Sequence, residues 1–194
     1  MKRVTFRTLS RWGTIIVFTF LLTSCQDKST SPVESPITGG ALTKVVEENF
    51  TYLVGVGGFP ENRTAASKGD TIIMSGSGNL SIHAKSVDGG GTYTQKTASG
   101  STFVGFWAAT QLISFKSYGT SEGFPSNFEG GNASLRVHLS PGLDGSSGTD
   151  GILDFQCLVG TPPPSAVEGI QLVVRGGANF ADILSGSTLF IRQP

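Results

Sequence analysis

Few side chains in this 194-residue sequence combine a reactive type with a suggestive spacing. Its two histidines, His83 and His138, each lie in a run of alternating apolar residues and share the face opposite them. This alternation predicts strand positions that face solvent. The alternative is that Arg136 and His138, with a neighbour such as Asp154, line a polar barrel interior. No H-x-H or H-E-x-x-H spacing occurs, so we expect no zinc site.

The two cysteines, Cys25 and Cys157, are in different settings. Cys157 lies between Phe155 and Val159 at a spacing of two, which predicts a small apolar side chain in the core. Nothing nearby in the sequence would act as the base of a thiol nucleophile.

G-x-S-x-G, P-loop and dinucleotide-binding patterns are missing, and the oxygen-rich run 144–151 lacks the terminal Glu of a calcium loop. We therefore assign no catalytic residue and expect no metal or cofactor.

The segment 119–132 is the best candidate for a binding site. Its glycines and proline predict a loop, yet it carries Phe124 and Phe128, and Gly58-Phe59-Pro60 echoes it. Aromatic side chains on loops either close a barrel mouth against water or stack on a sugar ring or another apolar ligand. The predicted ligand is accordingly a small apolar molecule or a carbohydrate, and the predicted binding residues are Phe124, Phe128, Lys116 and Glu129.

The elements that must position these residues are β-strands. Apolar residues alternate in short runs between turn-forming residues, and no stretch sustains a helical period of 3.6. The predicted fold is all-β, a single and mostly antiparallel barrel of about eight strands over residues 50–194, with a β-sandwich as the alternative. The predicted strands begin near residues 50, 71, 92, 102, 135, 153, 170, 180 and 188.

The longest apolar run, 102–118, differs from the others. Its odd positions include Phe103, Trp107 and Phe115, but the even positions are also partly apolar. A regular strand would bury only one of these sets, so we predict a bulge that switches the faces midway.

The rhythm of glycines and strands resembles the layout of allene-oxide-cyclase-like and dirigent-like barrels. The features that carry this resemblance are Gly-Ser-Gly at 76–78, Gly-Gly-Gly-Thr-Tyr at 89–93, and the long aromatic strand that follows. The domain also resembles small β-domains of unassigned function in secreted bacterial proteins. The resemblance implies an eight-stranded barrel and transfers no catalytic residue.

The N-terminus has a different composition. Four basic residues, Lys2, Arg3, Arg7 and Arg11, precede an apolar run over 12–22, which is too short for a membrane-spanning helix of about 20 residues. The next residues, Leu22-Thr23-Ser24-Cys25, resemble the lipobox of bacterial lipoproteins. The resemblance implies a signal peptide over 1–24, cleavage before Cys25 and lipidation of its thiol.

Residues 25–49 are polar and rich in serine, threonine, proline and glycine, and they predict a flexible tether. Loss of the four basic leader residues would leave 14 − 4 = 10 basic residues against 14 acidic ones, a net charge of −4. An acidic chain argues against a nucleic-acid partner. The expected partner is a membrane, contacted through the N-terminal lipid, and the expected location is the cell envelope, in the outer membrane where one exists.

Two classes of function fit this sequence. We favour a non-catalytic envelope lipoprotein that binds a ligand or partner or has a structural role. The alternative is a barrel enzyme of the isomerase or cyclase type. An enzyme would gather several polar residues in one enclosed pocket, namely Lys116, Glu129, Arg136, His138, Asp154 and Arg175. The sequence leaves the oligomeric state open.

Overall fold

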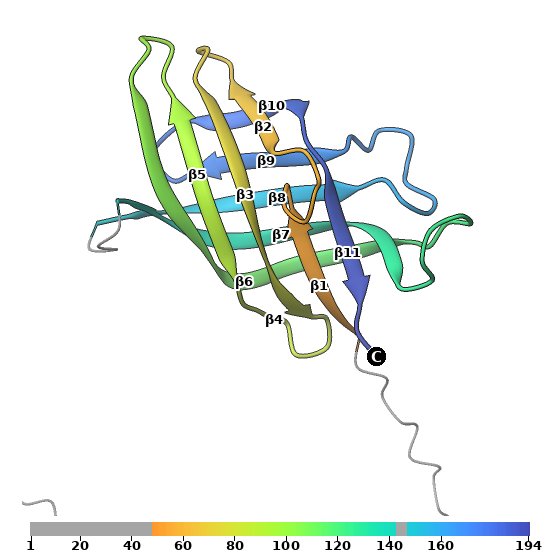
Figure 1. Ribbon diagram of the computed structural model, residues 1–194. Coiled ribbons are helices and arrows are strands. Elements are labelled where there is room, and N and C mark those ends of the chain that lie inside the picture. Colours follow the sequence, from red (N-terminus) through yellow and green to blue (C-terminus); the bar gives the residue numbers. More distant parts are fainter. Residues whose placement is uncertain (1–47, 143–146) are drawn as a thin grey trace, which may run out of the picture. The chain divides into compact units, whose positions relative to one another are not determined.

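The computed structural model describes residues 48–142 and 147–194, which form eleven β-strands (Figure 1). The predicted signal peptide, Cys25 and the predicted tether up to residue 47 lie outside the described residues. The strands are β1 (Asn49–Val54), β2 (Asn62–Ala66), β3 (Thr71–Ser81), β4 (Ser86–Val87), β5 (Gly90–Lys96), β6 (Thr102–Gly119), β7 (Phe128–Pro141), β8 (Thr149–Cys157), β9 (Gly169–Val174), β10 (Asn179–Ser185) and β11 (Thr188–Arg192). Within these two ranges, no helix is long and apolar enough to span a membrane.

The strands form a single antiparallel sheet that closes into a ring, which confirms the all-β prediction. One route from β3 to β7 runs through β5 and β6. The return from β7 to β3 divides in two: one branch is β8, β9, β10 and β2, and the other is β11 and β1. We call the place where β8 and β11 diverge from the same edge of β7 the fork.

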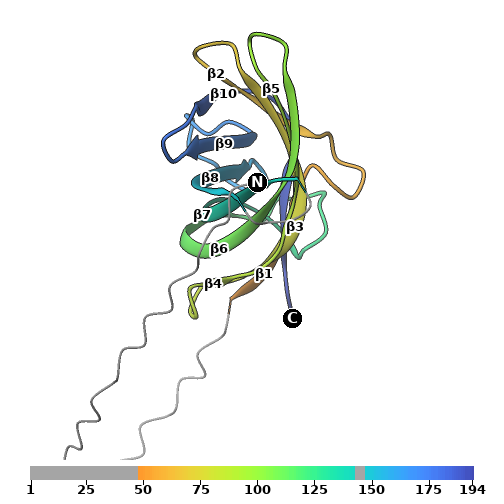
Figure 2. The same ribbon diagram turned by 90° about the vertical axis from the view of Figure 1, so that its left-hand side faces the viewer.

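The ring folds into two facing layers, and β6 takes part in both (Figures 1 and 2). It runs beside β5 in one layer, bends, and continues beside β7 in the other. The pairing of β6 with β7 shifts register in three places, after Ala109, Leu112 and Ser117. Trp107 and Leu112 are an odd number of residues apart, so a regular strand would place them on opposite faces, yet both are buried. The register shifts confirm the predicted bulge and explain why both faces of this strand are partly apolar.

The space between the layers is filled by apolar side chains. Phe115 lies with its ring centroid 4.9 Å from that of Phe50 and 4.9 Å from that of Phe190. Phe155 is 5.3 Å from Phe190 and 5.4 Å from Tyr52, so the rings form one continuous cluster. Cys157, predicted to be a core residue, is 2% exposed.

Two of the eleven strands, β2 and the two-residue β4, were missed by the sequence analysis, and His83 was misplaced. β2 was not predicted, because its sequence Asn-Arg-Thr-Ala-Ala is polar, yet Asn62 and Thr64 are fully buried. His83 was expected on a strand, but it lies exposed in the turn that joins β3 to β4. The alternation around it ends at Ser81, the last residue of β3.

The run Asp88-Gly89-Gly90-Gly91 does not reverse the chain, although such residues commonly form turns. Both β4 and β5 pair with the same edge of β3, and Gly89 only interrupts them. Opposite it, a Cβ on Gly78 would lie 2.1 Å from the carbonyl oxygen of Asp88 and 2.5 Å from the hydroxyl of Tyr52. Glycine is required there because the Tyr52 ring packs against the backbone and its hydroxyl donates to that carbonyl at 2.8 Å.

Candidate functional site

The phenylalanines that the sequence analysis singled out line a single pocket at the fork. Phe59 comes from the β1–β2 loop, Phe124 from the β6–β7 loop, and Phe128 is the first residue of β7. The pocket has a volume of about 450 Å³, within the range of roughly 300–1,000 Å³ that small-molecule sites occupy. Phe124 is 54% exposed at the pocket, whereas Phe59 and Phe128 are partly buried and pack against the core.

The remaining walls come from β8, β11 and the loops beside them. They comprise Cys157 at the end of β8, Leu158, Val159 and Glu168 in the β8–β9 loop, Ser121 in the β6–β7 loop, and Ser187, Thr188 and Leu189 at the start of β11. Cys157, Thr188 and Leu189 are almost completely buried, so the pocket reaches from the loops to the edge of the core.

The carboxylate of Glu168 holds the two sides of the fork together. One oxygen accepts a hydrogen bond from the backbone N–H of Thr188 at 2.7 Å, and the other accepts one from the N–H of Leu158 at 2.7 Å. The Thr188 hydroxyl donates to the carbonyl of Gln156 at 2.6 Å. A side chain therefore takes the place of direct strand pairing between β8 and β11, and it leaves room for a pocket between them.

The loops around the pocket are attached to one another. The N–H of Gly160 donates to the Ser121 hydroxyl at 2.8 Å, and the N–H of Thr161 donates to the carbonyl of Tyr118 at 2.7 Å. These bonds join the β8–β9 loop to the end of β6 and the loop that follows it. A site held in this way loses little conformational entropy when a ligand binds.

The thiol of Cys157 is protonated at neutral pH. Burial raises its pKa to about 11, and hydrogen bonds from the backbone of Val159 and Phe190 oppose this only in part. A thiol in this environment is a poor nucleophile. Cys157 contributes an apolar surface to the pocket rather than a reactive group.

Glu129, predicted as a binding residue on a loop, lies instead on β7 and is 1% exposed. The loop ends at residue 127, because Phe128 and Glu129 already pair with Ile191 and Phe190 of β11. The Glu129 carboxylate accepts hydrogen bonds from Arg192 Nη2 at 2.6 Å and Nε at 3.0 Å, and another from the Ser117 hydroxyl. Its carboxylate forms an ion pair within the fold, and Glu129 is not among the residues that line the phenylalanine pocket.

Arg192 completes this ion pair. Burial works against its charge, but the hydrogen bonds to Glu129 and Glu48 raise its pKa above the ordinary value. Its guanidinium carbon also lies 4.9 Å from the centre of the Phe50 ring. Lys116, the remaining predicted site residue, is exposed on β6 opposite Asn132 and is not among the residues that line the phenylalanine pocket.

The six polar residues that an enclosed catalytic pocket would need do not meet in one enclosed pocket: Arg136, His138 and Arg175 lie around Asp150 at the surface, whereas Glu129 is in the buried ion pair with Arg192. Arg136 and Arg175 are exposed, and the Arg136 Nε donates to Gln111 at 3.2 Å. His138 and Asp154 occupy half-buried positions that alternate with the core residues of β7 and β8. Arg136, His138 and Asp154 therefore face away from the apolar interior, so the alternative in which they line a polar barrel interior is wrong.

His138 has a partner on that outer face. Its Nδ1 lies 2.9 Å from a carboxylate oxygen of Asp150, and this hydrogen bond lowers the pKa of Asp150 below its ordinary value. Asp144, part of the loop considered above for calcium, lies outside the described residues. Within 48–142 and 147–194, the structure brings together no group of three or more metal-ligating side chains of the His, Cys, Asp and Glu types.

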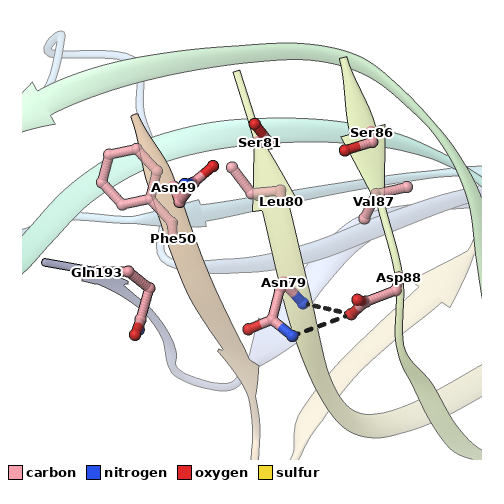
Figure 3. A pocket seen from close by; sticks show the side chains of 9 residues that line it. All are labelled: Asn49, Phe50, Asn79, Leu80, Ser81, Ser86, Val87, Asp88 and Gln193. Atoms are coloured by element: carbon pink, nitrogen blue, oxygen red, sulfur yellow. Dashed lines mark hydrogen bonds between the residues drawn. The ribbon is translucent and has the colours of Figure 1, made fainter. Parts of the chain in front are cut away.

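A second hollow, of about 370 Å³, is lined by polar residues together with Phe50, Leu80 and Val87 (Figure 3). The side chains of Asn79 and Asp88 point toward one another, and one Asp88 oxygen accepts bonds from the Asn79 N–H at 2.9 Å and Nδ2 at 3.1 Å. Asn79 also accepts from the Thr51 hydroxyl, which in turn accepts from Gln193. These groups bond mainly to one another, so the hollow is a weaker candidate than the phenylalanine pocket.

The sequence analysis missed the β8–β9 side of the pocket. Three consecutive prolines at 162–164 mark a loop there, and alternate loops of an antiparallel sheet lie at the same end. That reasoning would have placed Leu158 and Val159 near Phe124. Glu168 has no such signal, because its role depends on the divergence of β8 from β11.

Comparison of the chain with protein-family models, curated proteins and solved structures finds no match.

Proposed function

We propose that this protein is a non-catalytic binding module of the cell envelope, which holds a small ligand in the phenylalanine pocket at the fork. The observation that carries this proposal is the convergence of Phe59, Phe124 and Phe128 on one pocket of about 450 Å³. Side chains from distant parts of the sequence meet there, and Phe124 remains 54% exposed. An exposed aromatic residue at a concave apolar site is typical of ligand binding.

The ligand can be sought directly. The full-length chain is purified from cells, and the small molecules that accompany it are identified by mass spectrometry. Phe124→Ala removes the most exposed pocket ring, and Phe103→Ala is a matched control because Phe103 is 52% exposed on β6, outside the pocket. We expect one compound to accompany the wild type and the control but not Phe124→Ala. Equal recovery with all three proteins would contradict the proposal.

The module is proposed to be attached to the membrane through lipid on Cys25. The basic leader, the apolar run and the sequence Leu22-Thr23-Ser24-Cys25 support this anchor. A single acyl chain gives only marginal membrane binding, so the several chains of a bacterial lipoprotein anchor would be needed for stable attachment.

The anchor predicts that Cys25→Ser abolishes labelling by a palmitate analogue and leaves a longer, unprocessed precursor. Cys157→Ser is the control because it removes the other cysteine, which is buried in the core. The expected result is normal labelling of the control and none of Cys25→Ser. Equal labelling of Cys25→Ser and the wild type would disprove the anchor.

A further inference from the structure

We infer that the ligand of the phenylalanine pocket is a neutral hydrocarbon group, either a ring or an acyl chain, and not a carbohydrate. This inference rests on the proposed function and names the ligand class. It follows from the hydrogen bonds of the polar groups that line the pocket, since the phenyl rings alone would accept a sugar face as well as a hydrocarbon.

Most of these polar groups are already occupied by the protein. Both carboxylate oxygens of Glu168 accept backbone N–H groups, and the Thr188 hydroxyl donates to a carbonyl. The Ser121 oxygen accepts from Gly160, and the carbonyl of Ser187 accepts from Asn62 Nδ2 at 2.9 Å. Among the described lining side chains, the hydroxyl hydrogens of Ser121 and Ser187 are the main donors left for a ligand.

A sugar would therefore be poorly matched to this pocket. A monosaccharide carries several hydroxyl groups, and each one that is buried without a hydrogen-bond partner weakens binding. A hydrocarbon incurs no such penalty and gains the full benefit of contact with the phenyl rings, Leu158, Val159 and Leu189.

Charge narrows the ligand class further. Glu168 places a carboxylate in the pocket wall, and a negative ligand group beside it would be repelled. A positive group would find that carboxylate already engaged by two N–H donors at 2.7 Å. The buried part of the ligand is therefore uncharged, and any polar or charged group it carries remains at the mouth beside Phe124.

Cys157 offers a test, because its thiol belongs to the wall of the pocket. In the full-length chain with Cys25→Ser it is the single thiol. Methanethiosulfonate reagents form a mixed disulfide with a thiolate and release methanesulfinate, so the attached group alone distinguishes them. Five reagents would be compared, carrying benzyl, hexyl, glucosyl, trimethylammonium-ethyl and sulfonate-ethyl groups. Each rate is divided by the rate measured in denaturant, which corrects for intrinsic reactivity.

We expect the benzyl or hexyl reagent to react at least tenfold faster than the other three on this scale, and the faster of the two identifies a ring or a chain. Phe124→Ala should remove most of the advantage, whereas Phe103→Ala should preserve it. A glucosyl or charged reagent that matches or exceeds the apolar pair would overturn the hydrocarbon assignment, and so would equal rates for all five. If Phe124→Ala changes neither any reaction rate nor the recovery of a ligand from cells, the proposed function itself fails, and not only the hydrocarbon assignment.

Discussion

At the scale of single residues, burial determines what the ionisable groups of this domain do. Cys157 and Glu129 are both almost completely buried, but only Glu129 has a positively charged partner. The thiol therefore remains neutral, whereas the carboxylate is held by Arg192 and Ser117. Neither group is free to act on a substrate.

The raised pKa of Cys157 predicts slow reaction with a negatively charged thiol reagent at pH 8. A pKa of about 11 leaves roughly one thiol in a thousand ionised at that pH. The reaction rate of the Cys25→Ser chain should increase about tenfold per pH unit between pH 8 and pH 10. Rapid, pH-independent labelling of the folded chain would show that the thiol is not in the environment described above.

The ion pair between Glu129 and Arg192 predicts an asymmetric pattern in urea unfolding. Arg192→Ala leaves a buried carboxylate without its cation and should lower the free energy of unfolding by about 2–3 kcal/mol. This loss is smaller than for a fully buried ion pair, because the Arg192 side chain is 40% exposed. Adding Glu129→Gln to that variant should restore part of the loss, since no buried charge then remains. A double variant less stable than Arg192→Ala would contradict this assignment.

Much of this residue-level detail could not be predicted from the sequence. The alternation around Cys157 was sufficient to predict its burial, and Phe124 and Phe128 were correctly grouped. Glu129 was misread because Gly130, Gly131 and Asn132 resemble a loop, although they lie within β7. A Cβ on Gly130 would lie 1.8 Å from the carbonyl oxygen of Val159, so this glycine reflects close packing between chain segments, which one sequence does not reveal.

At the scale of elements, the fork is the feature that positions the pocket. β11 pairs with β7 only at Phe128 and Glu129, and beyond that point β8 takes over the same edge. The long strand β6 was predictable from its apolar run, and its bulge from its two mixed faces. The fork was not predictable, because it depends on which strand pairs with each half of β3 and β7.

Replacement of Glu168 tests the fork. Glu168→Ala removes the acceptor of the Leu158 and Thr188 N–H groups and should lower the free energy of unfolding by about 1–3 kcal/mol. Hydrogen exchange at these two amides should accelerate more than at amides in the centre of β8. Glu122→Ala, at an exposed position of the β6–β7 loop, is the control and should change neither quantity. If both variants behave alike, Glu168 does not hold the fork closed.

At the scale of the whole molecule, the described domain is a ring of strands whose interior is filled by apolar side chains. The fold class was predictable because strand alternation recurs along the whole domain. The ring and its two layers were only partly predictable, since the pairing of β1 with both β3 and β11 joins the two ends of the domain. The phenylalanine pocket lies at the fork, between the end of β8 and the start of β11.

The central claim, that the phenylalanine pocket binds a ligand, is tested most directly by equilibrium binding of a probe. N-phenyl-1-naphthylamine is a neutral apolar fluorophore that brightens on leaving water, and it would be titrated into the full-length Cys25→Ser chain, with and without Phe124→Ala or Phe103→Ala. The three proteins share the same leader, so their differences report on the substituted rings. Loss of one phenyl contact of roughly 1.5 kcal/mol predicts about tenfold weaker binding for Phe124→Ala and no change for Phe103→Ala. Equal affinity of all three proteins would contradict the account.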